Sequence, residues 1–313
     1  MQVIRGINDQ NTGAPLVLTI GSFDGVHIGH QQLLETLKAR AASIGGRSAL
    51  MTFTPHPRIA LNKDKEKLRL LSNDAEKEAL LERFGLDVLF FVPFNSAFSQ
   101  QEAGEFLHQV LLKQLGVKHL VIGYDHRFGK NRGGDFAFLQ AEAQRTAAFT
   151  VEEISQQAID DLAISSTKIR LSLESGDVGL ANKLLGYHYT LTGQVVQGDQ
   201  IGRKLGYPTA NLAVNDPYKQ IPGAGVYATE VNIDGRWLPA MTYIGMRPTI
   251  NGQVNNIETN IFNFKGDLYG TTLSIAFRCH MRHDLKFESL EELTSQIAVD
   301  ERKVRLYFGL PEA

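Results

Sequence analysis

The stretch GSFDGVHIGH (21–30) lies between LVLTI (16–20), which is typical of a buried strand, and QQLLETLKAR (31–40), which is typical of a helix. In open α/β sheets, ligands bind beyond the carboxyl ends of the strands. The N-terminus of the next helix then offers free N–H groups and the positive end of its dipole to a phosphate. His27 and His30 are three residues apart, so one helical turn places both imidazoles on the same side, with Gly29 leaving room between them. The stretch therefore predicts a phosphate site at a strand-to-helix turn.

On both sides of this turn, short apolar runs alternate with amphipathic segments through about residue 155. This alternation predicts βαβ units and a doubly wound parallel sheet. Ser99 and Glu102 have the spacing of a capping box that opens a helix toward Leu115, and Gly116 stands where a C-cap glycine belongs. The predicted strands are 16–20, 48–53, 86–92, 119–123 and 149–154.

From about Tyr187 the sequence changes to short β-rich runs separated by glycine and proline, which favours an all-β barrel. SSTKIRLSLESGDVGLANKLLG (165–186) predicts two short helices broken at Ser175 and Gly176. Because 313 residues exceed what one core usually serves, we expect two domains, 1–186 and 187–313. Ser289 and Glu292 predict a capping box on a closing helix that packs on the barrel. Its expected apolar stripe is Leu290, Leu293, Ile297, Val304 and Tyr307.

The composition is that of a globular protein, with 43% hydrophobic and 21% charged residues. A net charge of -2 gives no positive field for steering onto nucleic acid, so an anionic ligand needs a local site. Cys279 is the single cysteine, so it forms no internal disulfide and lacks zinc-site spacing. Without a secretory signal or a membrane-spanning stretch, the pattern favours a cytoplasmic protein with no membrane partner, and a homo-oligomer stays open.

A second glycine-rich connection, GDQIGRKLGYPTAN (198–211), combines three glycines with Arg203 and Lys204. Glycines let backbone N–H groups approach phosphates, and the two cations can screen phosphate charge. The spacing is not that of a Walker A loop, so any ATP site here is not of the P-loop type.

Each motif taken alone also has a structural explanation. HxxH can be a pair of surface histidines at a helix start, although the glycines and the aspartate beside it are unusual helix residues, and it lacks the glutamate of the HExxH zinc motif. Ser165, Ser166 and Thr167 can simply cap a helix. PTANL (208–212) can be a turn before a strand, and Glu258 an outward-facing strand residue.

Together the N-terminal motifs resemble the HxGH superfamily of nucleotidylyltransferases, in the GxFDGxHxGH form of bacterial FAD synthetases. VIGYDHRFGKNRGGD (121–135) and ISSTKIR (164–170) resemble that family's second and third motifs, although His126 stands where the family commonly has phenylalanine. The resemblance implies a Rossmann-like domain in which the FMN phosphate attacks the α-phosphorus of ATP and pyrophosphate leaves, with His27 and His30 stabilising the transition state. The residues that it implies for ATP and phosphate binding are Gly21, Phe23, Asp24, Gly29, Asp125, Ser165, Ser166, Thr167 and Arg170, with added charge from Lys168.

The C-terminal segment GxxxGRxLGxPTANL resembles the riboflavin kinase family, as do PGAGVYA (222–228), YIGMRPT (243–249), IETNIFNF (257–264), GDLYG (266–270) and QIAVDERKVRLYF (296–308). The resemblance implies a Greek-key barrel kinase in which Thr209 and Asn211 hold Mg²⁺ and ATP phosphates and Glu258 is the base toward the ribityl 5'-hydroxyl. The sequence departs from the family at Asn260, where a histidine is usual, and at 281–284. The remaining implied residues are Gly202, Arg203, Lys204, Gly206 and Pro208 for ATP, and Phe264 and Arg282 for flavin.

We therefore predict a bifunctional enzyme that uses ATP and Mg²⁺ to convert riboflavin to FMN and then FMN to FAD. HxGH alone does not name the acceptor, so a nucleotidylyltransferase acting on phosphopantetheine or nicotinamide mononucleotide is one alternative. A flavin-binding regulatory module that has lost catalysis is another. The attached kinase-like barrel argues against the first alternative, and the joint presence of His27, His30, Thr209, Asn211 and Glu258 argues against the second.

Overall fold

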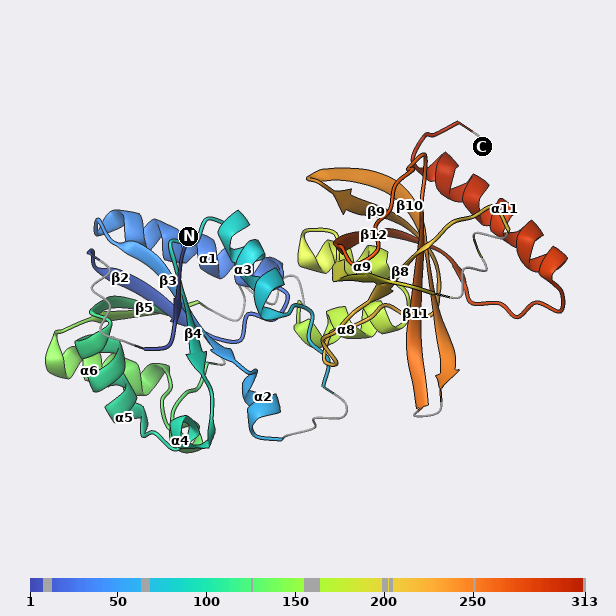
Figure 1. Ribbon diagram of the computed structural model, residues 1–313. Coiled ribbons are helices and arrows are strands. Elements are labelled where there is room, and N and C mark those ends of the chain that lie inside the picture. Colours follow the sequence, from blue (N-terminus) through green and yellow to red (C-terminus); the bar gives the residue numbers. More distant parts are fainter. Residues whose placement is uncertain are drawn as a thin grey trace. The chain divides into compact units, whose positions relative to one another are not determined.

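The structure is a computed structural model that describes residues 1–7, 13–62, 68–124, 126–154, 164–198, 202, 205–249 and 252–311, without the side chains of 246–249 and 252–255. Its contacts divide the chain into two compact units, Met1–Ser166 and Thr167–Ala313 (Figure 1).

The first unit contains a six-stranded sheet in which every pair of neighbouring strands is parallel. All five residues of its LVLTI strand are buried, as expected for a parallel strand covered on both faces. The strand order is β1-β4-β3-β2-β5-β6. The strands are β1 (Gln2–Arg5), β2 (Leu16–Ile20), β3 (Arg47–Thr54), β4 (Val88–Pro93), β5 (Val117–Gly123) and β6 (Thr150–Ile154).

Helices cover both faces of this sheet (Figure 1). Leu34 and Leu37 of α1 (Ile28–Ser43) and Leu81 of α3 (Asp74–Arg83) belong to one buried cluster. The other face packs against the π-helical segment η1 (Phe106–Gln114) and α6 (Phe136–Thr146). The described short helices are α2 (Pro57–Ala60), α4 (Ser96–Ser99), α5 (Ala103–Glu105) and the 3-10 turn η2 (Lys130–Arg132). The doubly wound α/β prediction is confirmed.

Two local predictions in this unit were wrong or incomplete. Strand β1 was missed, because four residues at a chain end are too few to show a period. The capping box at Ser99 does not form: Ser99 is the last residue of α4, and its hydroxyl donates to the Ser96 carbonyl at 2.7 Å. The next helix begins at Ala103 instead, and its N-cap residue Glu102 makes no side-chain capping bond.

The second unit contains a closed barrel of six antiparallel strands in the order β10-β11-β8-β7-β12-β9. Strands β9, β10 and β11 are consecutive, and β12 returns to lie beside β9, which is the Greek-key arrangement that the resemblance implied. The strands are β7 (Thr190–Val196), β8 (Ala210–Ala213), β9 (Gly225–Ile233), β10 (Arg236–Thr249), β11 (Gly252–Ile261) and β12 (Thr272–His283).

In the described part of the second unit, the helices α8, α9 and α11 accompany the barrel. α8 (Ser166–Glu174) and α9 (Val178–Leu185) confirm the predicted helix pair, and Gly176 at the break has a φ of 83°. α11 (Leu290–Tyr307) is capped by Ser289, whose hydroxyl accepts from the Glu292 N–H.

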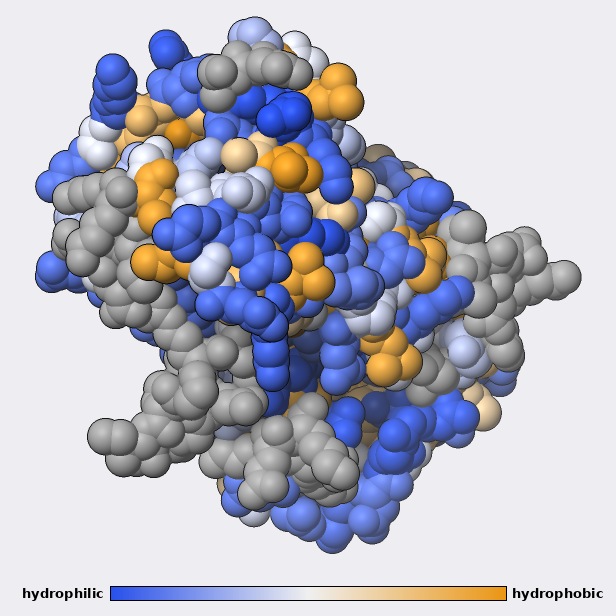
Figure 2. All heavy atoms as spheres, turned by 90° about the vertical axis from the view of Figure 1, so that its right-hand side faces the viewer, coloured by the Kyte–Doolittle hydropathy of each residue, from blue (hydrophilic) through white to orange (hydrophobic). Residues whose placement is uncertain are grey.

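The predicted apolar stripe of α11 is correct only in its middle. Ile297 and Val304 pack against the barrel, whereas Leu290 and Tyr307 are exposed, and at the C-terminal end Phe308 and Leu310 pack against the barrel in place of Tyr307. The face shown in Figure 2 is mainly hydrophilic, with hydrophobic side chains scattered over it, as is usual for a protein surface.

Candidate functional sites

The first site lies where the order of the parallel sheet reverses. From β2 the chain moves outward through β3 and β4, whereas β5 and β6 lie on the opposite side of β2. GSFDGVHIGH follows β2, and the second motif follows the neighbouring strand β5, so both motifs begin at the carboxyl ends of adjacent strands. Ligands of open α/β sheets bind at such a switch point.

The turn between β2 and α1 has an unusual backbone. Phe23 and Val26 have φ angles of 46° and 37°, and Gly25 has 78°. The buried Asp24 holds this conformation, since its Oδ1 accepts from the N–H groups of Leu71 and Ser72 at 2.8 and 3.1 Å. Asp24 therefore anchors the turn from inside, and the phosphate contact that the resemblance implied for it stays a prediction.

His27 and His30 lie face to face, as the spacing predicted. Their ring centroids are 3.7 Å apart, and Phe23 stacks on the outer face of His30 at 4.5 Å. His27 is the N-cap of α1, and its Nδ1 accepts from the His30 N–H at 3.4 Å. In a neutral ring this arrangement leaves the proton of His27 on Nε2, where it can be donated to a phosphate oxygen.

A buried cation beside the histidines was missed by the sequence analysis. Lys77 of α3 is only 5% exposed, and its Nζ donates to Thr52 Oγ1 of β3 at 3.4 Å. Burial lowers the pKa of Lys77, and the charges of Asp24 and Asp74 oppose that shift. Burial also lowers the pKa of His30 well below its usual value, and the charges of His27 and Lys77 lower it further. Nothing in DAEKEALL (74–81) separates this lysine from an ordinary surface lysine of a helix.

The third motif reaches the same turn. The Ser166 hydroxyl donates to the Asp24 carbonyl at 3.1 Å, so ISSTKIR joins GSFDGVHIGH through the first residue of α8. Thr167 and Arg170 lie on α8, and Ser165 immediately precedes it. Gly21 follows β2, and its N–H donates to the Met51 carbonyl at 3.0 Å, while Gly29 is buried in α1. Asp125 lies outside the described residues.

The second site forms where β11 pairs with β8. Glu258 stands opposite Asn211 in the register of these strands. Its Oε2 accepts from the Thr209 hydroxyl at 3.1 Å, and its Oε1 accepts from Asn256 Nδ2 at 2.7 Å. Asn260, two residues further along, donates from Nδ2 to the Pro208 carbonyl at 2.8 Å. Side chains of β11 thus hold the PTAN segment in place.

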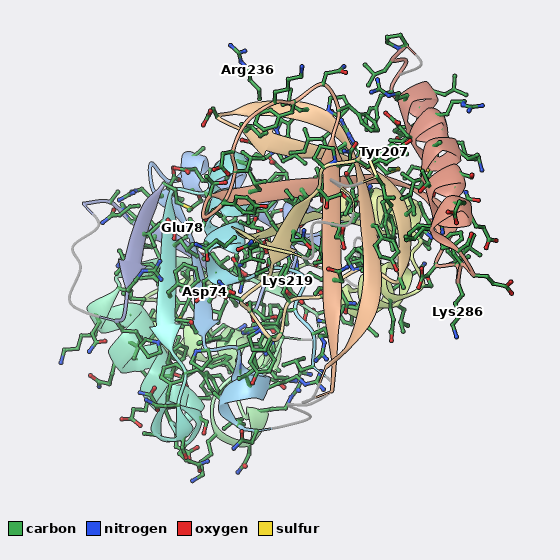
Figure 3. All side chains as sticks on the ribbon, turned by 45° about the vertical axis from the view of Figure 1, so that its right-hand side comes forward. Asp74, Glu78, Tyr207, Lys219, Arg236 and Lys286 are labelled. Atoms are coloured by element: carbon green, nitrogen blue, oxygen red, sulfur yellow. The ribbon has the colours of Figure 1, made fainter. Side chains whose placement is uncertain are left out.

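Glycines keep the connection before PTAN close to β8. A Cβ at Gly198 would collide with the side chain of Asn211, and one at Gly202 would collide with the Tyr207 carbonyl. Gly206 has a φ of 88°, which disfavours any other residue. Tyr207 lies near α11 (Figure 3), and burial together with the charge of Glu301 raises its pKa. Arg203 and Lys204 lie outside the described residues.

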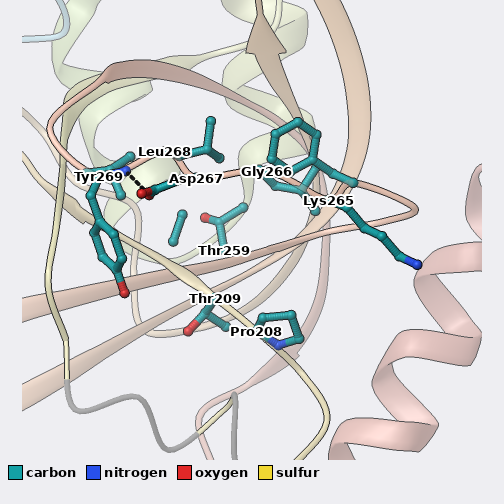
Figure 4. Close-up of a pocket in the computed structure, with 12 residues that line it drawn as sticks. Pro208, Thr209, Thr259, Lys265, Gly266, Asp267, Leu268 and Tyr269 are labelled. Atoms are coloured by element: carbon teal, nitrogen blue, oxygen red, sulfur yellow. Dashed lines mark hydrogen bonds between the residues drawn. The ribbon is translucent and has the colours of Figure 1, made fainter.

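A cavity of about 490 Å³ opens beside Thr209 and Pro208. The loop that follows β11 forms its opposite wall, with Tyr269 and Lys265 at either end (Figure 4). Phe264, which the resemblance assigned to flavin, lines this same cavity. The lining residues are Val195, Pro208, Thr209, Ala210, Thr259, Ile261, Phe264, Lys265, Gly266, Asp267, Leu268 and Tyr269.

Arg282 is held by α11. Its Nε and Nη2 both lie 2.8 Å from Oδ2 of Asp300, whose side chain is 2% exposed. On the neighbouring barrel surface, the Tyr243 hydroxyl donates to Asp284 at 3.0 Å. Burial, with Asp284 and Glu258 adding to it, raises the pKa of Tyr243 to about 12.

The donor atoms at Thr209 and Asn211 are oxygens of a hydroxyl and a side-chain amide, which suit a hard cation such as Mg²⁺. No cluster of three or more His, Cys, Asp or Glu side chains fit for a metal occurs in the described part of the chain. Two neutral donors fit an ion that takes most of its ligands from water and substrate phosphates.

The two family models that match the chain define a class of transferase with two ATP-dependent activities. The family model for FAD synthetase matches residues 9–168, and that for riboflavin kinase matches residues 185–308. Bifunctional riboflavin kinase/FMN adenylyltransferases are similar over nearly their whole length. That of Pseudomonas fluorescens is 38% identical over 96% of both chains, and that of Escherichia coli K12 is 38% identical over 99% of both chains. The chain belongs to this bifunctional family, and it is a riboflavin kinase and FMN adenylyltransferase that produces FMN and FAD.

One solved structure has the same fold over nearly the whole chain. The crystal structure of a macrolide-efflux protein from Streptococcus pneumoniae is 32% identical, with a TM-score of 0.88 over 97% of this chain and 99% of the other. In the part of this chain that the structure describes, no helix is both long enough and apolar enough to cross a membrane.

Proposed function

We propose that the two activities are separate: residues 1–186 adenylylate FMN, and residues 187–313 phosphorylate riboflavin. The observation that carries this division is the Glu258 carboxylate, which lies in hydrogen-bond contact with Thr209 on the barrel, while the histidine pair lies at the switch point of the sheet. Each site has its own phosphate-type loop and its own ionisable side chains, as two reactions require.

In the adenylylation site, the turn at 21–27 and the N-terminus of α1 receive the phosphates of ATP. His27 donates from Nε2 to a phosphate oxygen, and the neutral His30 stacks behind it. The arrangement stabilises charge as the FMN phosphate oxygen bonds to the α-phosphorus and the bond to pyrophosphate breaks. We assign FMN, and no other phosphate-bearing acceptor, to this site because the kinase on the same chain produces FMN.

In the kinase site, Glu258 accepts the proton of the ribityl 5'-hydroxyl as its oxygen bonds to the γ-phosphorus and ADP leaves. Thr209 and Asn211 hold the ATP phosphates and Mg²⁺. When bound, Mg²⁺ neutralises charge on the β and γ oxygens. The cavity beside Thr209 takes ATP, which places Phe264 beside the nucleotide. Arg282 is the side chain that we assign to flavin.

The test replaces Glu258 by Gln, which keeps the shape and the acceptor but removes basicity. We expect riboflavin phosphorylation to fall about 10²- to 10⁴-fold, the usual contribution of a general base. FAD formation from supplied FMN should stay within about twofold of the wild-type rate, since that reaction uses the other unit.

Two controls are needed. ADP binding should be unchanged, and the unfolding of the barrel, monitored by the fluorescence of the single tryptophan Trp237, should also be unchanged. A variant that phosphorylates riboflavin within about threefold of the wild-type rate would show that Glu258 is a structural strand residue.

A further inference from the structure

Alternation along β11 places a row of polar side chains on its outer face. Ile257 and Thr259 are 2% and 1% exposed and point into the barrel. Because strand side chains alternate, Asn256, Glu258 and Asn260 point the other way, toward PTAN. Two of these side chains contact PTAN directly. Glu258 accepts a hydrogen bond from the Thr209 hydroxyl, and Asn260 donates one to the Pro208 carbonyl. The resemblance assigned no role to Asn256.

The contact of Asn256 is with the carboxylate itself. Its Nδ2 lies 2.7 Å from Glu258 Oε1, and an ionised carboxylate only accepts, so the amide NH₂ must be the donor. Hydrogen bonds to a charged partner are among the stronger ones in proteins. The other oxygen, Oε2, accepts from Thr209 at 3.1 Å, a longer bond from a hydroxyl that can rotate.

We propose that Asn256 is a positioning residue of the kinase: it holds Oε1 of Glu258 and thereby leaves Oε2 as the oxygen that takes the proton from the ribityl hydroxyl. This inference rests on the proposed role of Glu258. The Thr209 hydroxyl leaves Oε2 when it turns toward bound ATP, and Oε2 becomes available to the substrate.

The proton balance of the step follows from this geometry. The O–H bond of the substrate breaks and an O–H bond forms at Oε2, while the substrate oxygen bonds to the γ-phosphorus and the bond between that phosphorus and ADP breaks. Throughout, Oε1 keeps the Asn256 bond, so the carboxylate stays in the plane in which Oε2 faces PTAN. Without Asn256, the carboxylate can rotate about its last side-chain bond, and Oε2 spends less time in reach of the hydroxyl.

The test measures Asn256→Ala in two backgrounds of the full-length protein, wild type and Glu258→Gln. In the wild-type background we expect kcat for riboflavin phosphorylation to fall about 10- to 100-fold, as small misplacements of catalytic groups do. KM for riboflavin and for ATP should stay within about twofold, because the amide holds the base and does not touch either substrate. In the Glu258→Gln background the same change should alter kcat by less than about threefold, since no base is left to position.

A matched control is Asn232→Ala. Asn232 is a strand asparagine of β9 whose amide oxygen accepts from the Gly235 N–H in the β9–β10 turn, at 3.1 Å. The Asn232→Ala variant should have an unchanged kcat. This result would show that the effect of Asn256→Ala comes from its contact with Glu258 and not from the loss of any asparagine on the barrel.

The outcomes distinguish the inference from the proposed function. An equal loss of kcat in both backgrounds, or no loss in the wild-type background, would overturn the role of Asn256 while leaving Glu258 as the base if Glu258→Gln is impaired. A Glu258→Gln protein with near wild-type kcat would overturn the proposed base, and the role of Asn256 with it.

Discussion

At His30, burial and neighbouring charge act in the same direction. Both lower the pKa of the imidazole, so the ring is neutral at neutral pH and stacks between Phe23 and His27 without a charge to solvate. The sequence predicted the histidine pair and its place after a strand, because motif spacing and the 3.6-residue helical period are local properties. It did not predict Lys77 or the inward anchoring by Asp24, because both depend on a contact with a segment about 50 residues away along the chain.

The lowered pKa of His30 predicts acid sensitivity of the first unit. In the unfolded chain the imidazole has its ordinary pKa of 6.5, so below that pH the unfolded state binds a proton that the folded state does not. The free energy of unfolding therefore carries no penalty from His30 above pH 6.5. It falls as the pH drops from 6.5 toward the pKa of the folded state, by up to about 1.4 kcal/mol per pH unit. His30→Gln should remove this part of the slope.

Hydrogen exchange of the β2 and α1 amides between pH 7 and 5, corrected for the intrinsic rates, measures this slope. Trp237 fluorescence reports the barrel alone and serves as the internal control. The same slope in wild type and His30→Gln would mean that the imidazole titrates alike in both states.

On the scale of elements, the connection between β7 and β8 depends on close packing. Gly198→Ala would push its Cβ into the side chain of Asn211, which stands opposite Glu258. We expect the kinase rate to fall at least about tenfold, since displaced positioning groups cost this much or more. Gly179→Ala, in α9, is the control: its Cβ meets only an Asp177 oxygen at 3.5 Å, and alanine favours a helix. Comparable kinase rates in the two variants would contradict the packing argument.

A buried ion pair joins α11 to β12. Asp300 accepts from Arg282 through two nitrogens and from Gln296 Nε2 at 2.8 Å. Asp300→Asn removes the charge opposite a guanidinium that is mostly buried, and such a change typically costs about 3–5 kcal/mol. Urea unfolding followed by Trp237 fluorescence measures the loss.

The matched control on the same helix is Glu291→Gln, because Glu291 is exposed in the first turn of α11. Its expected effect is below about 0.5 kcal/mol, as for most surface substitutions. Equal midpoints for the Asp300 and Glu291 variants would show that the pair contributes no more than a surface charge.

Elements with a clear period were predicted well, and elements that depend on distant contacts were not. The five predicted strands of the sheet and the helix pair around Gly176 reflect apolar runs and glycine breaks that any local window contains. Whether Ser99 caps a helix depends instead on which local hydrogen bond its hydroxyl makes. It donates to the Ser96 carbonyl and does not cap the following helix. Which residues at the C-terminal end of α11 meet the barrel, Phe308 and Leu310 and not Tyr307, likewise depends on contacts with the barrel strands that no window of α11 contains.

At the scale of the whole molecule, two folds with different strand connections are joined in one chain. The contacts divide it between Ser166 and Thr167, while the family models end at 168 and begin at 185, so α8 and α9 connect the two. The functional boundary near residue 186 stays a prediction. The connecting helices include Arg170, which the resemblance gives to the adenylylation site, although the contacts group it with the barrel.

A mixing experiment tests whether one chain carries two independent sites. Two full-length variants, His27→Ala/His30→Ala and Glu258→Gln, are incubated with riboflavin, ATP and Mg²⁺, separately and mixed, and riboflavin, FMN and FAD are separated over time. We expect the histidine variant to stop at FMN, the Glu258 variant to phosphorylate riboflavin at least about 100-fold more slowly than the wild type but to convert supplied FMN to FAD, and the mixture to make FAD from riboflavin. If either variant loses both reactions while folded, or if the mixture makes no FAD, the two sites are not independent.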